Sequence, residues 1–473
     1  MSRLRFLTAC AACSLAVLLG ASAPAASASQ GQSTFFEAPA ALLNPATRPA
    51  TLSVLQTLGV HALRVELSWH AVAPRPDSRR RPSFDQTDPA AYAWGQYDDL
   101  IDAAHALGWQ VLLTVSSPVP RWAQANPASR TLVDHPSSRE FGQFMTAVGR
   151  HYGSLVSTFA IWNEPNHHEF LEPQFFANGW PASPRIYRSL YQAGYAGLQA
   201  AGIAVPHVLL GETAPEGLAH AQAPLRVANV GPLVFLRETL CLNASYRRSG
   251  SCTPLAAAGY AVHPYPSAAG PTAMPRNRET ITIASLSRLG RALDLAARAG
   301  ALAAHLPIYI TEFGIMSKPN RYQGVAPAVQ AEWDAISEHI AWANPRVASF
   351  AQYLLRDDPP PRRGSRAVGF QTGLEYSSGV RKPLFAGFSV PLTVTRRGGG
   401  YALWGFVRPA GGATSVTVEV QRPRARRFEV LAQVATNGLG YWTLSSSTPG
   451  SHWRVRWTGP GGKRYTGPSI AAR

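Results

Sequence analysis

Eight short apolar runs are the feature of this sequence that most restricts its fold. They recur between about residues 32 and 390, with amphipathic stretches between them. The runs lie at 34–39, 62–67, 110–115, 159–163, 207–211, 259–263, 308–313 and 349–355. Because they lack the apolar–polar alternation of a half-exposed strand, we expect strands that are buried on both faces, as in a parallel sheet covered by helices.

Several of the intervening stretches have the period of an amphipathic α-helix. The clearest are 96–108, 281–300 and 326–343. Gly108 and Gly300 end two of them and suit the C-terminus of a helix. Eight strand–helix units predict an α/β fold, a (β/α)8 TIM barrel over residues 32–390. A doubly wound open sheet is the alternative, although no glycine-rich phosphate-binding turn follows the first run.

The pattern changes after about residue 390 to runs of alternating apolar and polar residues. "LTVTRR", "ATSVTVEVQR", "RRFEVLAQVAT" and "SHWRVRWTG" are separated by turn residues, among them Asn437-Gly438. Residues 391–473 therefore predict a small all-β sandwich of the immunoglobulin or fibronectin kind. Its tryptophans leave two roles open, namely carbohydrate binding or packing in a structural sandwich that lies on the barrel. They are Trp404, Trp442, Trp453 and Trp457.

The N-terminus has the pattern of a secretory signal peptide over residues 1–28. Arg3 and Arg5 precede an apolar stretch, and a small-residue cleavage site follows it. No later segment has the ~20 apolar residues of a membrane span, so we expect a secreted, soluble protein. In that oxidising location, Cys241 and Cys252 are the cysteines left after cleavage, and we expect them to form a disulfide.

Charge and composition exclude several classes of function. The chain is 46% hydrophobic and 15% charged, which is typical of a globular protein rather than a disordered one. Its net charge is +17, but the arginines are scattered and form no basic stripe with interleaved aromatic residues. We therefore predict no nucleic-acid partner. We also expect a monomer without a metal or organic cofactor.

Two glutamates follow apolar runs at positions where a buried carboxylate is costly without a function. Glu164 follows the fourth run and Glu312 lies at the end of the seventh. In a barrel, catalytic groups lie at the C-terminal ends of strands, and strands four and seven face each other across the mouth. Two glutamates there can approach to the ~5–5.5 Å that separates the carboxyl groups of retaining glycosidases.

These residues carry a family resemblance that covers most of residues 32–390. "IWNEPN" and "ITEFG" resemble the (β/α)8 retaining glycoside hydrolases of the clan that includes families 5 and 39. Further pieces match, namely "LRVELSWHAVAP" at 63–74, "PRWA" at 120–123 and "HPY" at 263–265. The resemblance implies that Glu164 is the general acid/base and Glu312 the nucleophile. It also implies that Asn163 binds the sugar 2-hydroxyl and that His263 lines the same subsite.

Elementary chemistry supports these roles. A nearby ionised Glu312 would raise the pKa of Glu164 and so keep the acid protonated. Arg64 and the Tyr265 hydroxyl are natural donors to Glu312, although Arg64 could also form a core salt bridge.

Other residues are candidates for substrate binding with an equally plausible structural role. Trp69 and Trp122 would provide aromatic platforms or else pack in the core. Many relatives have a tryptophan at the end of the eighth strand, where this chain offers Tyr353 or Gln352. Glu212 is either a third site carboxylate or a structural one. His167 and His168 either bind substrate or lie exposed.

The sequence thus predicts a secreted retaining glycoside hydrolase that cleaves β-O-glycosidic bonds in a carbohydrate substrate. A non-catalytic carbohydrate-binding or cell-surface protein on a barrel scaffold is the alternative from another class. A transglycosylase with the same residues is the alternative among enzymes.

Overall fold

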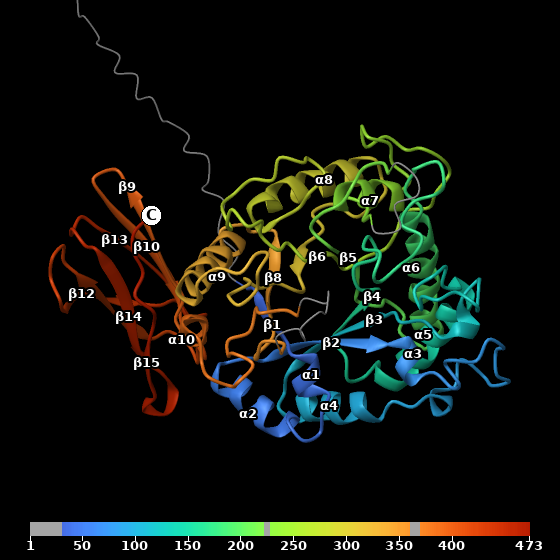
Figure 1. Ribbon diagram of the computed structural model, residues 1–473, viewed down its shortest axis with the longest axis horizontal. Helices are drawn as coiled ribbons and strands as arrows, with labels where there is room; N and C mark the ends of the chain where they lie inside the picture. Colours follow the sequence, from blue (N-terminus) through green and yellow to red (C-terminus); the bar gives the residue numbers. More distant parts are fainter. Residues whose placement is uncertain (1–30, 222–227, 360–368) are drawn as a thin grey trace, which may run out of the picture.

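The computed structural model describes residues 31–221, 228–359 and 369–473. The predicted signal peptide lies outside the described residues. The chain forms a barrel and a smaller β-sandwich, with two helices of the barrel between them (Figure 1).

Eight parallel strands form a closed barrel in chain order. They are β1 (Ser33–Glu37), β2 (Ala62–Ser68), β3 (Gln110–Ser116), β4 (Thr158–Ile161), β5 (Val208–Thr213), β6 (Gly259–Val262), β7 (Ile308–Ile310) and β8 (Val347–Tyr353). The barrel closes where β1 pairs with β8, in a register that sets Glu37 opposite Tyr353. The predicted barrel is therefore confirmed, and the open-sheet alternative is wrong.

Helices cover the outside of the barrel (Figure 1). The α-helices are α1 (Pro39–Leu42), α2 (Arg48–Thr57), α3 (Trp69–Val72), α4 (Gly95–Ala106), α5 (Ser138–Tyr152), α6 (Ser183–Ala200), α7 (Pro232–Thr239), α8 (Leu286–Arg298), α9 (Pro327–Trp342) and α10 (Pro383–Ser389). Short 3-10 helices are η1 (Pro89–Ala91), η2 (Arg121–Ala123), η3 (Ile283–Ser285) and η4 (Pro460–Gly462). None of the helices in the described ranges is long and apolar enough to cross a membrane.

The predicted glycine ends of α4 and α8 are confirmed. Gly108 has φ +70° and Gly300 has φ +68°, values that only glycine adopts without strain. The N–H of Gly108 donates to the carbonyl of His105, and the N–H of Trp109 donates to that of Ala104. This pair of bonds satisfies the last carbonyls of α4 in the Schellman arrangement, and Gly300 does the same for α8.

Two catalytic-candidate strands end earlier than the sequence suggested. The apolar runs continue to Asn163 and Phe313, whereas β4 ends at Ile161 and β7 at Ile310. The backbone leaves the β conformation after β4 because Trp162 has φ +72° and Glu164 has φ +37°. Non-glycine residues in this region are strained, and such strain clusters at functional sites.

The C-terminal strands form two antiparallel sheets, as predicted for a sandwich. One sheet has the order β13 (Tyr441–Ser446), β10 (Gly400–Phe406), β9 (Leu392–Arg397), and the other has the order β12 (Phe428–Ala435), β11 (Ser415–Gln421), β14 (His452–Thr458), β15 (Arg464–Thr466). The predicted turn is present, because the N–H of Gly440 donates to the Asn437 carbonyl. The sequence reading missed β10, β13 and β15.

The sandwich packs against α9 and β1 of the barrel. Trp404 stacks on His339 of α9, with 4.6 Å between ring centroids. The Arg408 guanidinium is buried and donates to Glu338 at 2.7 Å and to the Thr34 hydroxyl of β1 at 3.3 Å. All four candidate tryptophans are at most 3% exposed, so they pack in the sandwich or at this contact instead of forming a sugar platform: Trp404, Trp442, Trp453 and Trp457.

Candidate active site

Arg64 is the central cation of the barrel mouth. It comes from β2, and its side chain is fully buried. Nη1 donates to Glu37 at 2.6 Å and to Glu312 at 3.2 Å. Nη2 donates to Glu212 at 2.8 Å and to the Asn163 side-chain oxygen at 2.7 Å, and Nε donates to the other oxygen of Glu212 at 3.1 Å. One guanidinium therefore ties together β1, β5 and the segments that follow β4 and β7.

Glu312 is held by donors at both of its oxygens. Arg64 donates to Oε2, and the Tyr265 hydroxyl donates to Oε1 at 2.7 Å. Burial and then the neighbouring Glu312 charge raise the pKa of Tyr265, so the hydroxyl keeps its proton for this bond. Hydrogen bonds of this kind favour a charged carboxylate and fix its direction.

Glu164 lies in the surroundings of an acid rather than a carboxylate. Burial raises its pKa to about 7, although the nearby His167 and Arg64 oppose the shift. Its Oε1 lies 2.9 Å from Nδ1 of His263, whose Nε2 lies 3.1 Å from the Thr311 hydroxyl. Burial lowers the pKa of His263, so the ring is neutral near pH 7.

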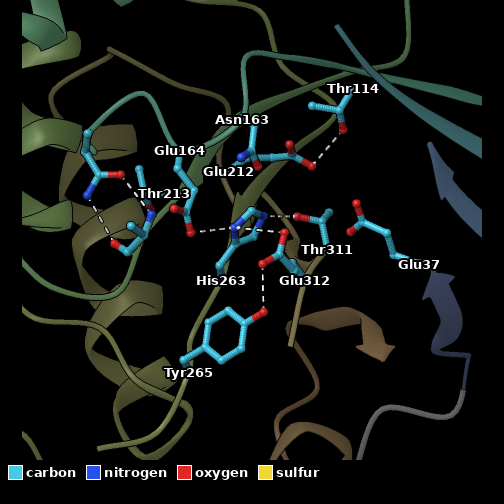
Figure 2. A network of polar contacts seen from close by, with 12 residues as sticks. Glu37, Thr114, Asn163, Glu164, Glu212, Thr213, His263, Tyr265, Thr311 and Glu312 are labelled. Carbon is cyan, nitrogen blue, oxygen red and sulfur yellow. Dashed lines mark hydrogen bonds and ion pairs between the residues drawn. The ribbon is translucent and has the colours of Figure 1, made fainter. Parts of the chain in front are cut away.

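The two glutamates converge from opposite sides of the mouth (Figure 2). A carboxylate oxygen of Glu164, one of Glu312 and a ring nitrogen of His263 all lie within 4.8 Å of one another. The separation of the glutamates is far shorter than the ~6.5–9.5 Å of inverting glycosidases and fits the retaining kind.

Both glutamates line a cavity of about 410 Å³. Asn163, Tyr265 and Tyr353 line it as well, and His167 lies at its β4 side. A second cavity of about 580 Å³ adjoins it, because Glu216 and Asn229 line both. The structure therefore brings together most of the residues predicted from the strand ends.

Trp69 and Trp122 are not among the residues that line this cavity. Trp69 is fully buried and stacks on Phe144, with 5.4 Å between ring centroids. Trp122 packs edge-on against Trp69 and donates its indole N–H to the Pro74 carbonyl. The expected sugar platform is therefore absent at these two positions, and both rings contribute to the packing beneath the loop after β2.

The remaining candidates divide between structure and site. Glu212 is buried against Arg64. Burial alone would raise its pKa, but the Arg64 charge and hydrogen bonds outweigh it and hold the pKa below its usual range. Glu212 is therefore a structural counter-ion. His168 bonds Asn229 through Nδ1 at 2.9 Å, which positions the loop after β5.

Two site carboxylates were missed by the sequence reading. Glu37 ends β1, and Glu66 lies in the middle of β2, and both line the cavity. Glu37 had the same signal as Glu164, a carboxylate at the end of an apolar run. Glu66 stands two residues after Arg64, and residues at i and i+2 of a strand share one face. The charged pair within an apolar strand could thus have indicated a polar barrel interior.

Comparison with known proteins shows where this fold occurs elsewhere. A glucosidase from Croceicoccus marinus is similar with a TM-score of 0.51 and 12% identity, over 88% of this chain and 93% of that one. A monomeric β-xylosidase from Caulobacter crescentus CB15 is similar with 0.49 and 15%, over 89% and 98%. A β-glycosidase from the hyperthermophile Thermosphaera aggregans is similar with 0.46 and 16%, over 73% and 84%.

The likeness to the Croceicoccus marinus glucosidase shows a shared fold. No protein-family model and no curated protein sequence matches the chain.

Proposed function

We propose that the protein is a secreted, retaining glycoside hydrolase that cleaves β-O-glycosidic bonds. The observation that carries the proposal is the approach of Glu164 and Glu312 to within 4.8 Å at the mouth of a closed barrel. A fold shared with a glucosidase supports a carbohydrate substrate. The disulfide between Cys241 and Cys252 supports a location outside the reducing cytoplasm.

In the first step, Glu312 attacks the anomeric carbon while Glu164 gives its proton to the leaving oxygen. The bond from carbon to the leaving oxygen breaks as the ester bond to Glu312 forms. Arg64 and Tyr265 hold Glu312 in place, so the nucleophile needs no reorganisation before attack. With its pKa raised to about 7, Glu164 holds the proton that this step requires.

In the second step, Glu164 acts as a base. It takes a proton from water while the water oxygen bonds the anomeric carbon and the ester bond to Glu312 breaks. Asn163 has its side-chain oxygen fixed by Arg64, which leaves its NH₂ group to donate to a sugar hydroxyl in the cavity. This is the contact that the family resemblance assigns to the 2-hydroxyl.

The proposal is tested with a mechanism-based 2-fluoro glycoside bearing a good leaving group. We expect a stable covalent adduct on Glu312, located by peptide mass spectrometry, and products of retained anomeric configuration by NMR. Sugar binding without labelling or turnover would instead identify a non-catalytic carbohydrate-binding protein. Transfer to an added acceptor sugar in preference to water would identify a transglycosylase.

Glu164→Ala is expected to affect substrates in proportion to how much their leaving group needs a proton. For alkyl glycosides and oligosaccharides, kcat/KM should fall by about 10²- to 10⁴-fold. For dinitrophenyl glycosides, glycosylation needs no acid, so the loss should be much smaller. Glu429→Ala, an exposed glutamate of the sandwich, is the control and should behave as wild type. Equal losses on both substrate types would contradict the acid role.

The pH dependence follows from the raised pKa of Glu164. Because the acid is protonated below about pH 7 and loses its proton above, kcat/KM for an alkyl glycoside should fall as the pH rises through about 7. In Glu164→Ala this alkaline limb should disappear. A wild-type profile that stays flat from pH 6 to 9 would show that another group controls proton transfer.

A further inference from the structure

The charge of the cavity is opposite to that of the protein. The chain has a net charge of +17, yet the described residues that line the cavity contain six glutamates and no lysine or arginine. The glutamates are Glu37, Glu66, Glu164, Glu169, Glu216 and Glu312. Arg64 lies beneath the cavity, and its charge is already shared among Glu37, Glu212 and Glu312. The proposed mechanism uses two of the six.

Glu37 offers a free acceptor in a buried position. Its side chain is 5% exposed, and Oε2 accepts from Arg64. No group in the described part of the chain donates to Oε1 of Glu37, although this carboxylate lines the cavity. Figure 2 shows the carboxylate of Glu37 directed toward the centre where Glu312 lies. A buried acceptor without a partner is costly unless a ligand supplies the donor.

Glu66 stands beside Glu37, on the next strand of the barrel. Among the described residues it has no basic group within ion-pair distance, and Arg64 is occupied by its other partners. Burial, followed by the nearby Glu312 and Glu212 charges, raises the pKa of Glu66 to about 7 against the opposing effect of Arg64. Without a cationic ligand, this side of the cavity therefore tends to hold protons.

We propose that Glu37 and Glu66 bind the ammonium group of an amino sugar, so that the substrate is a β-glycoside whose sugar carries a free primary amine. The inference rests on the proposed function and names its substrate class. An ammonium group brings one positive charge and three N–H donors to the free oxygens of two carboxylates. A neutral hydroxyl brings one donor and no charge. An N-acetyl group is neutral and larger, so it should be rejected.

The test compares three 4-nitrophenyl β-glycosides at pH 7, namely the glucosaminide, the glucoside and the N-acetylglucosaminide, with the galacto series run in parallel. We expect wild type to favour a free amine over the neutral sugar by about 30-fold or more in kcat/KM, the scale of one buried charged contact. The preference should grow as the pH rises from 5.5 to 7, because Glu66 becomes charged.

Glu66→Gln keeps the shape of the side chain and removes its charge. It should reduce the preference for the amine by about 30-fold or more, and kcat/KM for the neutral glucoside should change far less. Glu429→Gln on the sandwich serves as the matched control and should leave the preference unchanged. The wild-type ratio needs no variant, so a Glu66→Gln protein that fails to fold does not prevent the test.

Two failures are distinguishable. If wild type hydrolyses the neutral glycosides as fast as the amino glycosides in both sugar series, the amino-sugar inference is overturned and the glycosidase proposal stands. If wild type hydrolyses none of the substrates and no fluoro glycoside labels Glu312, the proposed function itself is overturned.

Discussion

Glu312→Gln is expected to lower kcat by about 10⁵- to 10⁶-fold, the scale on which loss of a covalent nucleophile acts. An amide cannot form the ester intermediate. It also has a single acceptor oxygen, whereas the wild-type carboxylate accepts from both Arg64 and Tyr265. The amide NH₂ must therefore face a donor, and a stability loss of about 1–3 kcal/mol should accompany the loss of activity. Steady-state kinetics and thermal unfolding measure the two effects.

Glu312→Ala separates the chemical effect from the structural one. Azide should enter the space left by the side chain and restore turnover of an activated β-glycoside. The product should be an α-glycosyl azide, because azide attacks from the face that Glu312 occupies in wild type. Absence of rescue, combined with near wild-type activity of Glu312→Gln, would exclude Glu312 as the nucleophile.

Arg64→Met should destabilise the barrel by about 3–5 kcal/mol, the range for breaking a buried ion pair. Without the guanidinium, Glu37 and Glu212 lose the buried cation that compensates their charge. In wild type, the depressed pKa of Glu212 contributes stability above its unfolded pKa and loses it as the pH falls. In the variant the sign reverses, because a buried carboxylate without a partner has a raised pKa.

The loss caused by Arg64→Met should therefore be larger at pH 8 than at pH 5. Urea unfolding at the two pH values measures this difference. Arg64→Lys retains the charge but not the planar fork that reaches several carboxylates at once, so an intermediate stability is expected. A change below about 1 kcal/mol for Arg64→Met would show that the carboxylates are not held by this cation.

The fold and the catalytic pair were predictable from local sequence. Each barrel strand is an uninterrupted apolar run because both faces are buried, and Glu164 and Glu312 interrupt that pattern at strand ends. The sandwich strands β10 and β13 were harder, because "GYALWGF" and "YWTLSS" contain glycine or serine beside large aromatic residues. Their pairing depends on partners distant in the sequence.

The wider site was not predictable in the same way. Glu37 reaches the cavity because β1 pairs with β8 and sets it opposite Tyr353, a register that only closure of the barrel defines. Trp69 follows a strand end as Glu164 does, yet it turns into an aromatic cluster with Phe141 and Phe144. Sequence position indicates that a residue is near the mouth, but side-chain packing decides which way it faces.

The contact of Arg408 with Thr34 joins residues 374 positions apart in the chain. The first strand of the barrel thus receives one of its anchors from a segment that leaves the ribosome almost last. A chain released before residue 408 would contain every catalytic group and still lack the arginine that bridges β1 and α9. Truncated products should therefore misplace Glu37 and expose Glu338, which makes completion of synthesis a requirement for an ordered catalytic mouth.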